Sequence, residues 1–217
     1  MISFIVPTTG RASLADTLDS IQPYDDDEII VIGRPCDLPG DPQPSALHTA
    51  STRLTVSAFR QTFLHRRLRK VRFIECDAFH DFGATERTIG MAAARGSHLA
   101  FMDDDDVYAP GARALMADAI ERTPDQPVLF RMRYPSGFVL WQEPVLRMGN
   151  VSTQMMLLPN DPAKLGRWQS GRRECDYDFL ASMTWPAESI VWRTEKIAEL
   201  SDHDDPFKGQ TMELSCA

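Results

Sequence analysis

Four consecutive aspartates, Asp103 to Asp106, have the clearest chemical potential in this sequence, and they directly follow the strand-like run His98–Met102. Adjacent carboxylates repel one another unless a cation lies among them. A hard divalent metal such as Mg2+ or Mn2+ prefers oxygen ligands and shares them with substrate phosphates. The cluster therefore predicts a metal and phosphate site, with a solvated acidic loop as the plainer alternative.

The elements leading to this cluster alternate between strands and helices. Strands are expected at Ile2–Val6, Glu28–Ile32, Val71–Cys76 and His98–Met102, with helices after Ser13, around Val56–Phe63, over Gly83–Arg95 and after Pro110. Gly96 is expected to cap the third helix. This order predicts an α/β fold with a mostly parallel central sheet flanked by helices. Ligands bind at the carboxyl ends of such strands, which favours a site over a loop.

The second half of the chain has a different pattern. Strands are expected at Val128–Arg133, Phe138–Trp141, Gln154–Leu158 and Ser189–Arg193, with helices after Asp176 and up to Leu200. No internal repeat or interdomain linker is evident, so we predict one domain over residues 1–217.

Composition is that of an ordinary globular protein. Of the 217 residues, 43% are hydrophobic and 25% are charged, and no apolar run is long enough to span a bilayer. The N-terminus lacks the basic region of a signal peptide. The four cysteines form no Cys-x-x-Cys pair, which argues for reduced thiols and against a structural zinc. We expect a cytoplasmic protein.

The charge is distributed unevenly. The net charge is −8, yet the segment from Ser51 to Ile74 holds seven basic residues and no acidic one. Such a segment on an acidic protein is typical of an anion-binding patch. The alternative is that its cations lie near a helix C-terminus, where the helix dipole favours them.

Three pieces of sequence occur in an order typical of one enzyme family. They are the strand and loop Phe4–Arg11, the block Gly83–Gly96 continuing through the four aspartates to Pro110, and the segment Cys175–Leu180. Over Ile2 to Leu180 the chain thus resembles the family 2 glycosyltransferases, which have the A-type glycosyltransferase fold. The resemblance implies a metal-dependent hexosyltransferase that inverts the sugar. It also implies a nucleotide-binding half, residues 1–110, and an acceptor-binding half with the tail, residues 111–217.

The resemblance also assigns donor-binding residues. The residues that it assigns to the nucleoside pocket are Pro7, Thr8, Thr9 and Arg11. An ordinary strand-to-helix turn with a polar rim is the alternative. The family often has an aspartate that accepts from uracil at the end of the second strand, where this chain has Ile32-Gly33-Arg34. A UDP-sugar is still the favoured donor.

The metal site follows from the same resemblance. Asp103 and Asp105 match the family's Asp-x-Asp, which implies that both belong to a Mn2+ or Mg2+ site, with Asp105 as the direct ligand. Asp103 and Asp104 are also candidates for binding the donor. Asp106 is either another ligand or a helix cap. His203 is the histidine expected to complete the metal shell, and a solvated tail is the alternative reading.

Two residues are assigned to catalysis and charge neutralisation. Arg87 matches an arginine of the family that would face the diphosphate, although a surface ion pair would explain it equally well. Asp176 matches the base that removes the acceptor's proton, with Cys175 in place of the family's glutamate. A helix N-cap is the alternative role for Asp176. Asp178 and Glu174 are the fallback bases.

The sequence does not identify the acceptor molecule. The resemblance extends to small enzymes that glycosylate hydroxymethylated bases of phage DNA, which implies a bacterial or phage-infected cell. The basic segment would fit such an acceptor, because Lys and Arg hold phosphates without reading the base sequence. A saccharide or a protein are the other candidates.

Two further functions remain as alternatives to glycosyl transfer. A sugar nucleotidyltransferase would release pyrophosphate, and an inactive module of the same fold would bind a nucleotide or glycan without turnover.

Overall fold

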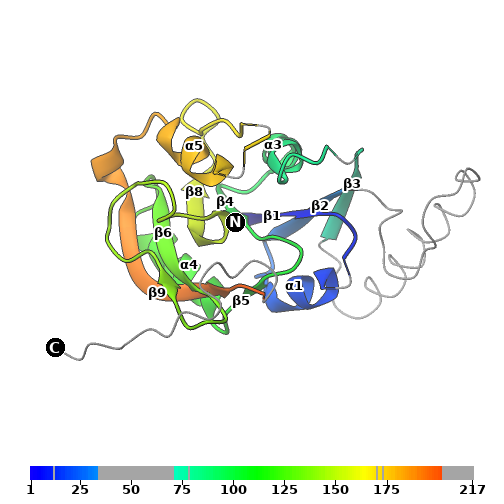
Figure 1. Ribbon diagram of the computed structural model, residues 1–217, viewed down its shortest axis with the longest axis horizontal. Helices are drawn as coiled ribbons and strands as arrows, with labels where there is room; N and C mark the ends of the chain where they lie inside the picture. Colours follow the sequence, from blue (N-terminus) through cyan, green and yellow to red (C-terminus); the bar gives the residue numbers. More distant parts are fainter. Residues whose placement is uncertain (12, 34–70, 78, 170, 173, 202–217) are drawn as a thin grey trace, which may run out of the picture.

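A computed structural model describes residues 1–11, 13–33, 71–77, 79–169, 171–172 and 174–201. One mixed sheet runs through both halves of the described chain, in the strand order β3-β2-β1-β4-β8-β6-β9-β5, with β7 paired to β6. Helices cover both faces of this sheet (Figure 1). The expected α/β fold is therefore confirmed.

The first half contributes the parallel part of the sheet. Its strands are β1 (Ile2–Thr8), β2 (Glu28–Gly33), β3 (Val71–Glu75) and β4 (His98–Phe101). Successive pairs β3–β2, β2–β1 and β1–β4 are all parallel. Strands β1, β2 and β4 are continuous apolar runs because both faces of this part of the sheet are buried.

Among the described residues, two α-helices lie on each face of the sheet. Side chains of α1 (Leu14–Ser20) and α4 (Ala112–Arg122) pack in one core with Phe4 of β1. Side chains of α3 (Ala84–Ala93) and α5 (Cys175–Ala181) pack in a second core with Ile5. The two pairs are seen on opposite sides of the sheet (Figure 1). The alternation of Phe4 and Ile5 between the two cores is the two-residue repeat of a strand.

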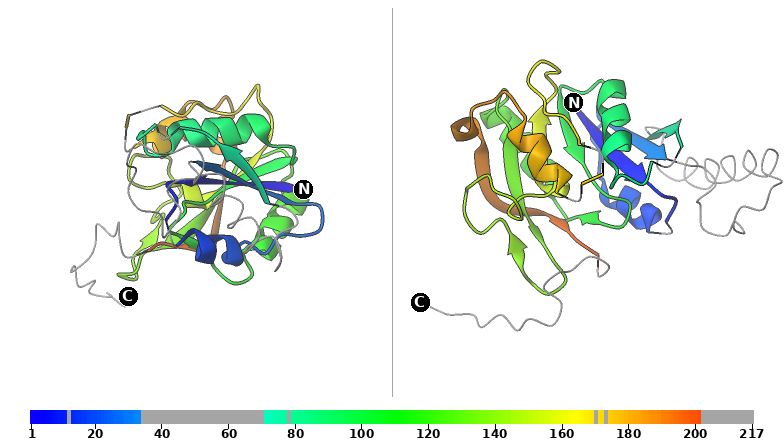
Figure 2. Two further views of the ribbon diagram at one scale, coloured as in Figure 1. Left: turned by 90° about the vertical axis from the view of Figure 1, so that its right-hand side faces the viewer. Right: turned by 45° about the horizontal axis from the view of Figure 1, so that its top comes forward.

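The second half extends the sheet with antiparallel pairs. Strand β8 (Met156–Pro159) lies antiparallel between β4 and β6 (Val128–Arg133), and β7 (Val139–Leu140) closes a hairpin with β6. Two short 3-10 helices, η2 (Thr153–Met155) and η3 (Ala187–Ser189), precede β8 and β9. Two further views show how the strands of the second half continue the sheet formed by the first half (Figure 2).

The end of the described chain differs from the prediction. A strand ending at Arg193 and a helix up to Leu200 were expected, but the structure has one long strand, β9 (Val191–Glu199). Strand β9 runs parallel to β6 and antiparallel to β5 (Val107–Tyr108), so it has partners along both edges. Backbone hydrogen bonding to β6 and β5 outweighs the local preference of the polar residues of β9 for a helix.

Two glycines are required by close contacts. A Cβ on Gly33 would lie 2.1 Å from the carbonyl oxygen of Thr8 on the neighbouring strand. Gly96 was expected to be a helix cap, but α3 already ends at Ala93 with Ala94 as its C-cap. A Cβ on Gly96 would instead lie 2.6 Å from the amide nitrogen of Ser3, and its own amide donates to Ser3 Oγ over 2.8 Å.

Several predictions fall outside the described residues. They are the helix around residues 56–63, most of the basic segment and His203. Within the part of the chain that the structure describes, no helix combines the length and apolarity needed to cross a membrane.

Candidate active site

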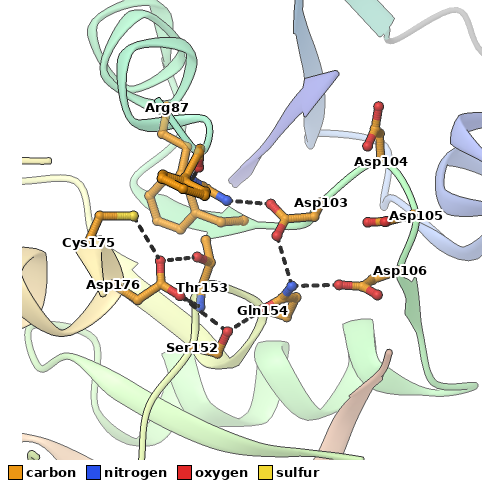
Figure 3. A network of polar contacts seen from close by, with 12 residues as sticks. Arg87, Asp103, Asp104, Asp105, Asp106, Ser152, Thr153, Gln154, Cys175 and Asp176 are labelled. Carbon is orange, nitrogen blue, oxygen red and sulfur yellow. Dashed lines mark hydrogen bonds and ion pairs between the residues drawn. The ribbon is translucent and has the colours of Figure 1, made fainter. Parts of the chain in front are cut away.

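The acidic loop lies at the carboxyl end of β4, next to the end of β1. Strand β4 ends at Phe101 and β5 begins at Val107, so both ends of the loop are anchored in the sheet. The four carboxylates point in different directions instead of converging on one point (Figure 3). Asp103 and Asp106 share one neighbour, Gln154, whereas Asp104 and Asp105 face Arg11.

Asp104 and Asp105 face the loop that follows β1. Asp104 Oδ2 accepts from Thr8 Oγ1 at 2.7 Å and from the amide of Thr9 at 2.9 Å. Arg11 pairs with Asp105 and lies 3.8 Å from Asp104. The structure thus brings together three residues assigned to the nucleoside pocket with two assigned to the phosphate and metal site. Pro7, the fourth pocket residue, is buried within β1.

Asp103 points the other way, toward Arg87 of α3. The Arg87 side chain is buried, pairs with Asp103, and donates to the carbonyl oxygen of Phe82 at 2.7 Å. Its guanidinium carbon also lies 5.1 Å from the ring centroid of Trp168. Of the two roles considered for Arg87, the geometry favours an ion pair. Arg87 is buried, however, and the pair fixes the orientation of Asp103, one of the predicted donor-binding residues.

Gln154 links the two ends of the acidic loop. Its amide nitrogen donates to Asp103 Oδ2 at 3.1 Å and to Asp106 Oδ2 at 2.6 Å. Asp106 is buried, and its Oδ1 accepts from the amide of Ser201 at 2.8 Å, just beyond β9. These contacts give Asp106 a structural role that joins the loop to η2 and to the end of β9.

Asp176 lies in the first turn of α5 and meets the same segment as Gln154. The N-cap position belongs to Glu174, so the expectation that Asp176 caps the helix is wrong. Its carboxylate instead contacts Thr153 Oγ1, and the amide of Thr153 donates to Oδ2 at 3.2 Å. Ser152 Oγ is 3.3 Å from the same Oδ2, and Cys175 Sγ is 3.7 Å from Oδ1.

The surroundings of Asp176 alter its acidity. Loss of hydration on burial raises the pKa of Asp176, and the positive charge of Arg87 and the Thr153 hydroxyl only partly offset it. Burial beside Asp176 likewise raises the pKa of the Cys175 thiol, to about 12. Asp176 is therefore a stronger proton acceptor than an exposed aspartate, and Cys175 is a neutral thiol.

The segment Ser152–Gln154 was not singled out from the sequence. Two hydroxyls and an amide directly before a strand are the only local signal, and such residues are common in turns. Their importance comes from the fold, which places them between the acidic loop and α5 (Figure 3). Thr153 and Gln154 are almost fully buried, at 1% and 3% exposed.

The carboxylates allow a test of whether a metal fits. Among the described residues, no group of three His, Cys, Asp or Glu side chains is arranged to hold an ion. Asp103 and Asp105 nevertheless offer hard oxygen ligands just beyond the carboxyl end of β4. This set suits Mg2+ or Mn2+ held by one or two carboxylates and completed by substrate phosphates. It does not form a cage that the protein supplies alone.

Comparisons with known proteins agree with this fold. The sequence model of glycosyl transferase family 2 matches residues 50–180, which is more than half of the chain. A search of curated proteins finds no match. The solved structure of S. aureus TarS 1-349 superposes with a TM-score of 0.58 at 14% identity, covering 92% of this chain and 60% of that one.

Two ligand complexes of that protein are also similar. The complex of TarS 1-349 with UDP-GlcNAc has a TM-score of 0.60 at 13% identity and covers 97% of this chain and 61% of that one. The complex with UDP has a TM-score of 0.59 at 15% identity, with 91% and 59% covered. The present chain therefore spans about three fifths of the length of these structures. At this identity the likeness shows a shared fold.

Proposed function

Since this chain belongs to glycosyl transferase family 2, we propose that it transfers a hexose from a nucleotide-diphosphate donor to an acceptor hydroxyl. The observation that carries the proposal is the meeting of Asp176 with the acidic loop through residues 152–154. A carboxylate able to act as a base thus lies beside the carboxylates of a donor site. These are the two parts that such a reaction requires.

The donor is proposed to bind where the loop after β1 meets the acidic loop. Thr8, Thr9 and Arg11 supply the polar groups on one side, and Asp103 and Asp105 supply carboxylates on the other. A UDP-sugar is the favoured donor, because TarS, with the same fold, has been solved with UDP-GlcNAc and with UDP. Gly33, the last residue of β2, has no side chain with which to read the base.

Metal dependence is part of the proposal. Asp105 and Asp103 would hold Mn2+ or Mg2+ together with the diphosphate, and His203 lies outside the described residues. The bound ion supplies Lewis-acid stabilisation of the charge that develops on the departing diphosphate. The pair of Arg87 and Asp103 contributes by keeping one of these carboxylates in a fixed orientation.

Asp176 is proposed as the base of an inverting transfer. The acceptor oxygen bonds to the anomeric carbon as the bond from that carbon to the diphosphate breaks. The acceptor's proton passes to Asp176, and the nucleoside diphosphate leaves with the bonding electrons. The raised pKa of Asp176 suits this role, because a stronger base takes a hydroxyl proton more readily.

The acceptor is proposed from charge alone. The basic segment between Ser51 and Ile74 fits the phosphates of a DNA acceptor, whose hydroxymethylated bases would supply the hydroxyl, and a saccharide or a protein are the other candidates. One of its seven cations is already used in the fold, since Arg72 pairs with Glu28 and donates to the carbonyl oxygen of Ala93. Binding to duplex DNA that weakens steeply with salt, followed by sugar transfer from the donor, would support this acceptor. Transfer to oligosaccharide with no DNA binding would reject it.

A thermal-shift panel tests the donor site. UDP, GDP, CDP, TDP and ADP are each added with and without Mn2+ to the wild type, to Asp105→Ala and to a control, Asp19→Ala, on the exposed surface of α1. A ligand of the native state raises the melting temperature. We expect a metal-dependent rise with UDP that is lost in Asp105→Ala and kept in the control. No metal-dependent rise with any nucleotide would reject the donor site.

The product identifies the reaction class. Release of nucleoside diphosphate from a nucleotide-sugar supports glycosyl transfer. Release of pyrophosphate from a nucleoside triphosphate and a sugar phosphate would indicate the nucleotidyltransferase alternative. Binding without release of either product would indicate an inactive module.

A further inference from the structure

The neighbours of Gln154 fix the orientation of its amide. Its amide nitrogen lies within hydrogen-bond distance of Asp103 Oδ2 and Asp106 Oδ2, at 3.1 and 2.6 Å. Ionised carboxylates only accept hydrogen bonds, so the NH2 group must face them and not the amide oxygen. The amide oxygen therefore faces Ser152, whose Oγ lies 2.7 Å away.

The orientation of Gln154 determines which acceptor receives the single hydrogen of the Ser152 hydroxyl. A serine hydroxyl carries one hydrogen and two lone pairs. Two acceptors compete for that hydrogen, Gln154 Oε1 at 2.7 Å and Asp176 Oδ2 at 3.3 Å. Gln154 Oε1 is the nearer, so it receives the hydrogen. Ser152 then presents a lone pair to Asp176, and this contact becomes a good hydrogen bond when Asp176 itself carries a proton.

Thr153 has the opposite relation to Asp176. Its hydroxyl and its amide both donate to the Asp176 carboxylate, and the side chain is buried. Hydrogen bonds donated to a carboxylate favour its charged form. Thr153 thus stabilises the ionised form of Asp176, whereas Ser152 can accept a hydrogen bond from the protonated form.

We propose that Ser152 and Thr153 are a pair of positioning residues, in which Thr153 holds ionised Asp176 and Ser152 receives it once it is protonated. The proposal rests on Asp176 being the base. Before transfer, Thr153 aims the carboxylate. After transfer, the new O–H of Asp176 donates to Ser152 Oγ, Ser152 donates to Gln154, and Gln154 donates to Asp103 and Asp106 (Figure 3). The protonated base is thereby joined in one chain of hydrogen bonds to a carboxylate of the donor site.

Other charged groups around Asp176 are few. Arg87 of α3 favours its ionised form, Asp103 of the acidic loop opposes it, and Cys175 on the same helix is a neutral thiol. Ser152 and Thr153 carry no charge, so substitutions at these two positions alter hydrogen bonding without altering the charge of the site.

The test measures the titration of Asp176 directly. Protein labelled with carbon-13 at the aspartate carboxyls is titrated by NMR, and the Asp176 signal is the one missing from Asp176→Asn. We expect Ser152→Ala to lower the pKa of Asp176, because the protonated form loses its acceptor. We expect Thr153→Val, nearly equal in volume, to raise this pKa, because the ionised form loses a donor. Thr153→Ser keeps the hydroxyl and is expected to titrate like the wild type.

Opposite shifts support the proposal. If both variants raise the pKa, Ser152 is simply a second donor to the carboxylate and the proposal is overturned. Unchanged titration in Ser152→Ala, with the fold confirmed by circular dichroism, overturns it as well. The titration needs no donor, acceptor or turnover. Its failure can therefore be told apart from failure of the glycosyltransferase proposal, which the nucleotide panel tests separately.

Discussion

The acidic loop and the first turn of α5 both bring carboxylates to one site, but the protein holds them in different ways. Arginines hold the acidic loop, with buried Arg87 on Asp103 and half-exposed Arg11 on Asp105. Asp176 instead meets hydroxyls, an amide and a neutral thiol. Positive charge thus lies directly beside the loop carboxylates, whereas Asp176 is held by neutral donors and burial raises its pKa.

Removing the Asp176 carboxylate is expected to have the largest effect on the rate of transfer. Asp176→Asn should lower the rate of nucleoside diphosphate release by about 10²- to 10⁴-fold, the range for loss of a general base. Nucleotide affinity, measured by calorimetry, should stay close to that of the wild type because the acidic loop is intact. Asp178→Asn is the matched control, since Asp178 lies in the same turn and pairs with Arg172 at 3.3 Å. Equal losses in both variants would contradict the assignment of Asp176.

Removing the buried arginine of the acidic loop should cost stability. Arg87→Met is expected to lower the free energy of unfolding by about 3 kcal/mol, because Asp103 loses its partner and Phe82 its donor. Urea unfolding followed by fluorescence measures the change. Arg122→Met, which breaks the exposed pair with Asp118, should cost no more than about 0.5 kcal/mol. Similar losses in the two variants would mean that burial does not distinguish these ion pairs.

The pH dependence of stability separates the two regions further. Burial raises the pKa of Asp176 in the folded state, so its stabilising contribution is full below the unfolded-state pKa and is lost as pH rises through the folded-state pKa. Asp176→Asn, which never ionises, should therefore melt higher than the wild type near pH 7, and the difference should shrink toward pH 4. Melting curves at several pH values measure this. A difference that grows on acidification would contradict the raised pKa.

The two regions also differ in how far the sequence predicted them. Strands β1, β2 and β4 were predicted because their apolar runs are continuous, and the acidic loop followed directly from its position after β4. Burial on both faces of a sheet leaves this signal in the sequence itself. Thr8, Thr9 and Asp104 were each predicted to bind the donor, but the contacts that Thr8 and Thr9 make with Asp104 were not predicted.

The surroundings of Asp176 could not be predicted in this way. Thr153 and Asp176 are separated by a stretch without a regular periodic pattern, and their contact depends on how α5 packs over β8. Strand β9 was partly missed for a related reason, because its polar residues are explained only by pairing with β6 and β5. Short-range patterns determine elements, whereas hydrogen bonds between distant segments depend on the completed fold.

The smallest expected change in stability concerns Arg11, and it tests the difference between the two arginines of the acidic loop. Its side chain is 48% exposed, so Arg11→Ala should change the free energy of unfolding by less than about 1 kcal/mol. The rise in melting temperature with UDP and Mn2+ should nevertheless shrink, because Arg11 lies at the proposed nucleoside pocket. Arg133→Ala is the matched control, since Arg133 pairs with Glu199 and is 45% exposed. It should show a similar small loss of stability and a normal response to nucleotide. If Arg11→Ala binds nucleotide normally but unfolds as easily as Arg87→Met, both arginines are structural, and the donor pocket must be sought away from the loop after β1.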